Sequence, residues 1–228
     1  MILRELPFVK CSKEPSVYRR CIKRHLLVDA FYVDDLFITG SNVLHINEFK
    51  REMSAEFEMS DLGRLTYYLG IEVIQHQGGI TLSQKSYAIK ILEEAGMTSC
   101  NLAHTPMDSG LKLSKSEEER SIDATIYRRN IGCLSYLLHT RLDLSYCVGV
   151  LSRYMQDLKE SHGAAMKQCL RYFQGTVGYG LTFGNTIERT TRLVGYSDSS
   201  HNVDQDDGKS TIIYHEFDSI LAMVYKEF

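Results

Sequence analysis

Two apolar runs flank an acidic pair in the stretch LLVDAFYVDDLFITG, which covers residues 26–40. Asp favours turns because its carboxylate accepts hydrogen bonds from nearby backbone N–H groups. Two apolar segments joined by such a turn are typical of a β-hairpin. The stretch therefore predicts a hairpin with Asp34 and Asp35 at its tip.

The segments that follow predict helices and short antiparallel strands. Apolar residues recur every three or four positions between Val43 and Phe57, which is the spacing of one helix face. A Gln77-Gly78-Gly79 turn predicts a second hairpin. Its expected strands cover residues 65–75 and 80–82, further helices cover 84–95, 122–139, 143–158 and 161–174, and last strands cover 179–183 and 192–197. Residues 212–228 are apolar-rich but have no clear period.

Composition limits the class of protein. The 228 residues are 43% hydrophobic and 24% charged, which is enough for a buried core and excludes a wholly disordered chain. The longest apolar run, 26–38, contains three Asp residues, so we expect no membrane-spanning segment. The first residues lack the basic and apolar regions of a signal peptide, so we expect an intracellular protein, cytoplasmic or nuclear, that is not secreted.

Cysteine spacing and net charge limit the kinds of binding site that the chain can contain. The six cysteines form no C-x-x-C pair, which indicates free thiols in a reducing compartment and no zinc site. The net charge of −3 means that any binding of nucleic acid must come from local basic patches. Lys167 and Arg171 lie one helical turn apart and could contact phosphates, or could form the solvated basic edge of a core helix.

The acidic pair suits metal-dependent phosphoryl transfer. Transfer of a nucleotide uses two divalent ions held by carboxylates. Mg²⁺ prefers hard oxygen ligands, which adjacent Asp residues at a rigid hairpin tip provide. By itself an Asp-Asp pair is more typical of an ordinary turn, so Asp34 and Asp35 need support from their neighbours.

Six blocks in series give that support, because they resemble the reverse transcriptase of copia-type retrotransposon Pol polyproteins. The blocks are YVDDL (32–36), MSDLG with YLGIEV (59–63, 68–73), GITLSQKSY with GM and TP (79–87, 96–97, 105–106), YR to TRLD (127–143), LSR to GL (151–181) and GYSDS (195–199). The resemblance covers roughly residues 7–211.

The resemblance implies an α+β fold: an incomplete palm of antiparallel hairpins with helices on one face, a helical thumb and a short strand pair like that of RNase H. The expected parts are a partial palm subdomain at 1–98, a linker at 99–120, a thumb or connection at 121–176, the start of a truncated RNase H-like domain at 177–211 and an unassigned tail at 212–228. We expect the strand at 192–197 to be an open edge or to pair only with 179–183.

The resemblance also implies roles for individual residues. Asp34 would bind the catalytic Mg²⁺ or Mn²⁺, Asp35 would assist beside it, and Asp198 would be the first metal-binding carboxylate of RNase H. Nucleic-acid contacts would come from Tyr32, Lys167 and Arg171. The implied partners are an RNA or DNA template–primer duplex and the rest of a Pol polyprotein, with no membrane.

Departures from the family pattern predict that the chain is an inactive fragment. The family uses a further Asp and nucleotide-binding fingers upstream of the YVDD box, and only 31 residues precede Tyr32. Side chains alternate along a strand, so Asp29 shares a face with Phe31 and Val33 rather than with Asp34. The alternative is a degraded or domesticated remnant without catalysis, acting at most as a nucleic-acid-binding or interaction module. A phosphohydrolase that uses the Asp pair would need a base or a further metal ligand, which the sequence does not supply.

Overall fold

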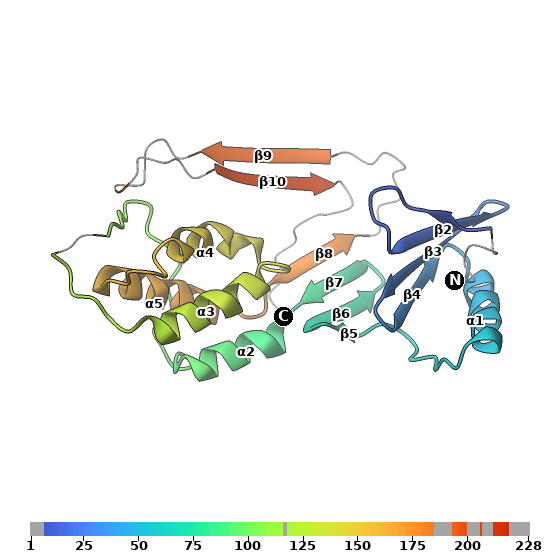
Figure 1. Cartoon of the computed structure of the whole chain (residues 1–228), viewed down its shortest axis with the longest axis horizontal. Helices are drawn as coiled ribbons and strands as arrows, with labels where there is room; N and C mark the ends of the chain where they lie inside the picture. The colour runs from blue at the N-terminus through green and yellow to red at the C-terminus, as the bar shows by residue number, and fades with distance from the viewer. Residues whose placement is uncertain (1–6, 116–117, 185–192, 200–205, 207–211, 219–228) are drawn as a thin grey trace. The chain divides into compact units, whose positions relative to one another are not determined.

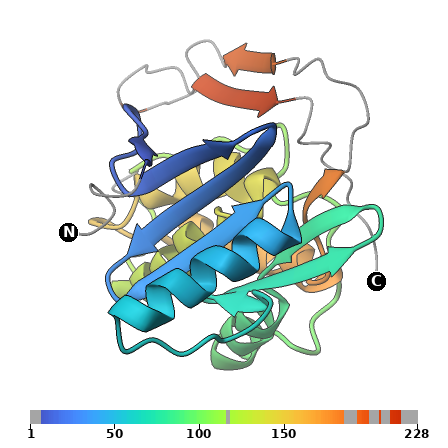
Figure 2. The same cartoon turned by 90° about the vertical axis from the view of Figure 1, so that its right-hand side faces the viewer.

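The structure is a computed structural model that describes residues 7–115, 118–184, 193–199, 206 and 212–218 (Figures 1 and 2). The chain divides into two compact units, Met1–Arg64 and Leu65–Phe228. The division falls inside the segment 1–98 that the sequence predicts as one partial palm. Helices and antiparallel sheets occur in the same chain, as the predicted α+β class requires.

Unit 1 is a four-stranded antiparallel sheet with a helix on one face (Figure 2). The strands β1 (Val9–Lys10), β2 (Val17–Ile22), β3 (His25–Tyr32) and β4 (Asp35–Gly40) pair in chain order. Helix α1 (Val43–Glu56) begins after Asn42, whose side chain accepts a hydrogen bond from the Leu44 N–H at 2.9 Å. Such a cap satisfies one of the free amides at a helix start.

The core of unit 1 lies between α1 and the sheet. Phe49 and Met53 of α1 are buried against Tyr18 and Leu27 of the sheet. This is the helix face that the apolar spacing of residues 43–57 predicts. Asp61, in the MSDLG block, accepts hydrogen bonds from Lys50 and from the Gly63 N–H, so it fastens the segment after α1 to the helix.

The sheet of unit 2 joins segments that are distant in sequence. Strands β5 (Tyr67–Tyr68), β6 (Ile71–His76) and β7 (Gly79–Ser83) form the predicted hairpin region. Strand β8 (Gly180–Gly184) then pairs antiparallel with β7, and the hydroxyls of Thr81 and Thr182 lie 3.0 Å apart across this pairing. The last strand of this sheet is therefore β8, which comes after α2, α3, α4 and α5 in the chain.

The predicted pairing of the last strands is wrong. Strand β9 (Leu193–Ser199) pairs with β10 (Ile212–Asp218) rather than with residues 179–183, of which 180–183 belong to β8 and pair with β7. β10 lies in the tail for which the sequence predicted no structure. The sequence contains no local signal for either choice because strand partners are selected by tertiary packing.

In the part of unit 2 that the structure describes, its core is enclosed by α2 (Lys85–Glu94), α3 (Ala124–Leu137), the 3-10 turn η2 (Leu142–Leu144), α4 (Ser145–Ser152) and α5 (Glu160–Gly175) (Figure 1). Apolar side chains of these segments meet in one cluster, in which Leu134, Leu144, Leu151 and Phe173 are completely buried. Helix α4 ends six residues earlier than the predicted 158. No helix among the described residues has the length and apolarity that a bilayer crossing requires.

The segment predicted as a linker is attached to the helices along much of its length. The phenol of Tyr154 donates to the Leu113 carbonyl at 3.0 Å, and Leu113 itself is buried. The His162 ring accepts from the Lys159 N–H at Nδ1, so its Nε2–H donates to the Ser114 carbonyl at 2.9 Å. Burial lowers the pKa of His162, consistent with this neutral form. Residues 101–114 thus form a strap over the bundle.

Candidate functional site

The predicted hairpin is present, and the acidic pair lies at its tip. Strands β3 and β4 pair from Leu27 with Gly40 to Tyr32 with Asp35, which leaves Val33 and Asp34 as a two-residue turn. Both Asp34 and Asp35 are exposed. Val33 is 85% exposed and has a φ of 54°, a left-handed conformation that costs a β-branched residue energy. The turn therefore holds a strained backbone next to the two carboxylates.

The acidic pair has the donor atoms that a hard divalent cation prefers. Neither the Asp34 nor the Asp35 side chain makes a hydrogen bond or ion pair within the part of the chain that the structure describes. Their carboxylate oxygens are available to an ion such as Mg²⁺, which keeps several waters and uses one or two protein carboxylates. The donor chemistry of the tip therefore fits such an ion. Over the same described residues there is no group of three or more His, Cys, Asp or Glu side chains that could hold a metal.

Asp29, the acid that precedes the tip in the same strand, is buried in the core of unit 1. It is 0% exposed, and its cross-strand neighbours are Tyr18 on β2 and Ile38 on β4. Neither carboxylate oxygen has a hydrogen-bond partner. Burial raises the pKa of Asp29 from 3.8 to about 7, against a weaker opposing effect of Arg20. Asp29 is thus directed into the core, on the strand face that includes Leu27 and Phe31. The predicted shared face holds for Phe31, whereas Val33 lies in the exposed turn.

The other predicted site residues differ in exposure and in their distance from the acidic tip along the chain: Tyr32 pairs with Asp35 at the tip, whereas Lys167, Arg171 and Asp198 lie more than 100 residues later. Tyr32 is 52% exposed at the end of β3. Lys167 is exposed on α5, while the Arg171 guanidinium donates to the Asn101 carbonyl at 2.5 Å and so holds the strap. Asp198 lies in β9, opposite Ile213, and the prediction for its side chain falls outside what the structure describes.

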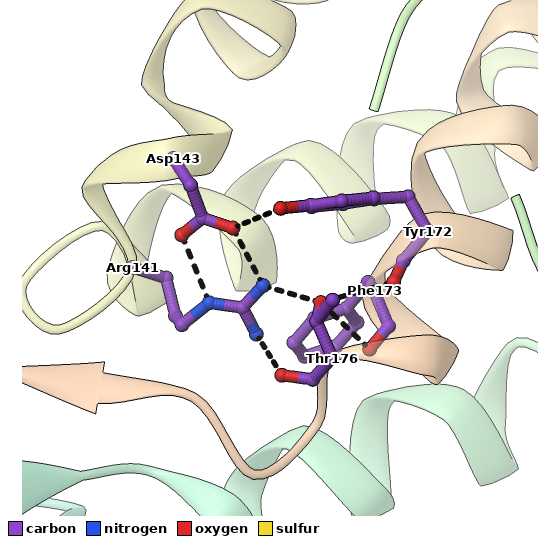
Figure 3. A network of polar contacts seen from close by, with 5 residues as sticks. All are labelled: Arg141, Asp143, Tyr172, Phe173 and Thr176. Atoms are coloured by element: carbon purple, nitrogen blue, oxygen red, sulfur yellow. Dashed lines mark hydrogen bonds and ion pairs between the residues drawn. The ribbon is translucent and has the colours of Figure 1, made fainter. Parts of the chain in front are cut away.

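A buried polar network in unit 2 contains Arg141 and Asp143, which belong to the sequence block 127–143 (Figure 3). Arg141 is 2% exposed and makes two hydrogen bonds with Asp143, from Nε at 2.9 Å and from Nη2 at 2.8 Å. It also donates to the carbonyl and the hydroxyl of Thr176 at the end of α5, while Tyr172 donates to Asp143 at 2.9 Å. The guanidinium lies 5.3 Å from the ring centre of Phe173.

This network is structural. Every group in it is satisfied by protein partners, and Arg141 and Asp143 are paired in the two-pronged geometry that planar guanidinium and carboxylate groups favour. The adjacent Thr140 hydroxyl donates to the buried Gln84 side chain at 2.7 Å. The Thr-Arg-x-Asp spacing (140–143) could have indicated a buried pair, since an acid two residues after an Arg is within its reach.

Comparisons with known proteins agree with the sequence blocks. A family model described as "Reverse transcriptase (RNA-dependent DNA polymerase)" matches residues 1–109. The retrovirus-related Pol polyprotein from transposon RE2 of Arabidopsis thaliana is 34% identical over 206 residues, which are 90% of this chain and 14% of that protein. The polyprotein from transposon TNT 1-94 of Nicotiana tabacum is 32% identical over 91% of this chain and 16% of its own length.

A shorter relative matches as well. An uncharacterized mitochondrial protein of Arabidopsis thaliana is 38% identical over 150 residues, which are 66% of this chain and 62% of that protein. No solved structure matches the chain. The chain spans about one seventh of the length of the two polyproteins. On the shared blocks, the hairpin and these similarities, the chain belongs to the reverse transcriptase family of copia-type retrotransposon Pol polyproteins.

Proposed function

We propose that the hairpin tip is the metal-binding element of an RNA-directed DNA polymerase and that the chain works as part of a larger palm and thumb on a template–primer duplex. The observation that carries the proposal is the pair of exposed, unpartnered carboxylates, Asp34 and Asp35, on a strained turn between two rigid strands. Residues held in strained turns cluster at functional sites, where the surrounding structure maintains them.

The roles of individual residues follow from this proposal. Asp34 and Asp35 hold the ions, and Mg²⁺ or Mn²⁺ bound there supplies activation of the attacking oxygen and stabilisation of the leaving group. Tyr32 and Val33 present apolar surface beside the carboxylates, where a primer end or a nucleotide would lie. Lys167 is the predicted phosphate contact that remains exposed, so it contributes more to duplex binding than Arg171, whose guanidinium is already engaged.

We further propose that the chain by itself does not catalyse nucleotide transfer. Two-metal chemistry requires carboxylates on both ions, and the nearest acid along β3 is Asp29, which is buried on the core side. A catalytic site therefore needs a further carboxylate from outside the described residues, as part of a longer Pol polyprotein or from another chain.

Metal binding at the tip tests the proposal directly. We expect Mn²⁺, a paramagnetic substitute for Mg²⁺, to broaden the amide signals of residues 32–36 selectively, with weak affinity on the order of 1 mM, because few protein ligands are present. The double variant Asp34→Asn/Asp35→Asn should lose the effect, while Glu58→Gln, an exposed acid in the same unit, should retain it. Equal broadening in the double variant would refute metal binding at the tip.

Primer extension tests the catalytic part. The purified chain should extend no primer on an RNA or DNA template with Mg²⁺ or Mn²⁺, because the described residues contain no group of three or more His, Cys, Asp or Glu side chains that could hold the ions. The readout is a labelled primer on a gel, with Asp34→Asn as the matched control. Extension above background that disappears in Asp34→Asn would overturn the proposed inactivity and support an active polymerase.

A further inference from the structure

The β2–β3 hairpin concentrates positive charge at one end of the unit 1 sheet. Residues 15–28 contain four Lys or Arg side chains and no acidic residue, although the whole chain has a net charge of −3. The four are Arg19, Arg20, Lys23 and Arg24. Because Ile22 pairs with His25, Lys23 and Arg24 form the two-residue turn of the hairpin, and both are exposed. This turn is a cationic tip at the opposite end of β3 from the acidic tip.

The backbone of the cationic tip suits glycine better than lysine. Lys23 has a φ of 57°, whereas Arg24 is not among the described residues with a positive φ. A positive φ at the first turn residue alone is the requirement of a type II′ turn, which usually has Gly there. A Lys in this left-handed conformation costs energy that Gly would avoid. Hairpin formation therefore does not explain why two cations occupy the turn.

Arg19 and Arg20 point to opposite faces of the sheet. The Arg20 guanidinium pairs with Glu52 of α1 at 3.9 Å, so Arg20 lies on the face that α1 covers. Side chains alternate along a strand, so Arg19 lies on the other face, opposite Val28 of β3. The same alternation along β3 places Tyr32 on the face of Arg19. This face thus has an aromatic ring beside the acidic tip and a cation nearer the cationic tip.

Acidic side chains do not neutralise these cations within the part of the chain that the structure describes. Arg19, Lys23 and Arg24 make no hydrogen bond or ion pair there. The acidic tip is too distant to do so, because the eight residues of β3 separate the two tips by about 23 Å. That separation exceeds the screening length of about 8 Å at physiological ionic strength. The two tips therefore act as independent charges.

We propose that Arg19, Lys23 and Arg24 bind the phosphate backbone of nucleic acid, at a contact site separate from the acidic tip. A nucleic-acid strand advances about 3.4 Å per nucleotide along a duplex, so the tips are about seven nucleotides apart. A strand that ends at the acidic tip and lies on the face of Arg19 would meet Tyr32 first. It would then reach Arg19 after about 13 Å, and the cationic tip last. Such contacts position the strand without reading its bases.

The position of these cations follows from the fold, whereas the choice of nucleic acid as the polyanion rests on the proposed function. An acidic protein segment is the competing occupant. Nucleic acid predicts a steep dependence of binding on salt, because each neutralised phosphate releases counterions from the duplex. The two occupants therefore differ in a measurable quantity.

Binding of a fluorescein-labelled DNA duplex of about 20 base pairs, long enough to span the sheet, tests the site on the full chain. The turn variant Lys23→Gly/Arg24→Ser removes both charges but keeps a type II′ turn sequence, so the hairpin should remain folded. We expect this variant to bind about tenfold or more weakly at about 50 mM salt. The slope of log K against log salt should fall in magnitude by about 1.8, or about 0.9 for each lost phosphate contact.

Control variants in unit 1 separate this site from general charge. Arg19→Gln should weaken binding and reduce the slope by about one, whereas Arg20→Gln, the same charge change on the face of α1, should alter neither. Arg51→Ala/Arg64→Ala removes two other exposed charges and should have little effect. Equal losses in this double variant and the turn variant would overturn the proposal. So would competition by a polyglutamate peptide as strong as that by unlabelled duplex, since it would indicate an acidic protein partner.

The measurement is independent of metal binding at the acidic tip, because EDTA is present throughout. Salt-dependent binding that is sensitive to the turn variant, in a chain whose acidic tip shows no Mn²⁺ broadening, would refute the metal site and support the cationic site. A wild-type chain without salt-dependent binding of the duplex would overturn the cationic site, whatever the result with Mn²⁺.

Discussion

Replacing Asp143 by Ala is expected to lower the free energy of unfolding of unit 2 by about 3–5 kcal/mol, since it leaves a buried guanidinium without its carboxylate. Arg141 is 2% exposed and the Asp143 side chain 11%, so water cannot replace the lost partner. The Thr176 carbonyl and hydroxyl, which also bind Arg141, do not neutralise its charge. Urea unfolding followed by circular dichroism measures the change.

Control variants distinguish the contribution of the Arg141–Asp143 ion pair from that of neighbouring interactions. Tyr172→Phe removes only one hydrogen bond to Asp143 and should cost about 1–2 kcal/mol. Glu160→Ala breaks an ion pair with Arg120 in the same unit, whose acidic side chain is 58% exposed, and the exposed pair should contribute less than about 1 kcal/mol. The double variant Arg141→Met/Asp143→Leu should be less destabilised than Asp143→Ala, because no unpaired charge remains. Equal losses for Asp143→Ala and Glu160→Ala would show that the network contributes little.

Replacing Asp29 by Leu is expected to stabilise unit 1, most strongly at neutral and alkaline pH. The pKa of Asp29 is raised from 3.8 to about 7 in the folded chain, so the folded state holds a proton that the unfolded state has lost between these values. Stability therefore falls as pH rises from 3.8 to 7, and the full penalty is present above pH 7. A shift of this size corresponds to roughly 4 kcal/mol.

The pH dependence distinguishes ionisation from packing. Asp29→Leu should add several kcal/mol at about pH 8 and less at about pH 3, below the unfolded-state pKa, where the wild-type carboxyl is mostly protonated in both states. Asp29→Asn keeps an unsatisfied polar group but cannot ionise, so it should flatten the pH dependence with a smaller gain at either pH. Amide exchange of Leu27, buried beside Asp29 in β3, reports on unit 1 alone. A wild-type stability that is constant between pH 4 and 7 would exclude an ionising Asp29.

Local patterns were sufficient to predict the acidic hairpin and most helices. The apolar alternation and the Asp turn of residues 26–40 determine β3, β4 and their tip, since strand faces and tight turns depend on neighbours in sequence. The buried face of α1 follows from residues spaced by three or four, because those side chains lie on one side of a helix. The sequence blocks were also sufficient to predict the family.

Only the tertiary structure decided which strands pair and which charges are buried. β8 joins β7 through residues 101 positions apart, and β9 pairs with a segment in which no period is visible. Alternation assigns each side chain to a strand face but carries no information on the neighbouring strand, because backbone hydrogen bonds are the same for every sequence. The environments of Asp29 and Arg141 are likewise not evident from the sequence. Only packing buries the Asp29 carboxylate without a hydrogen-bond partner and surrounds the Arg141 guanidinium with acceptors.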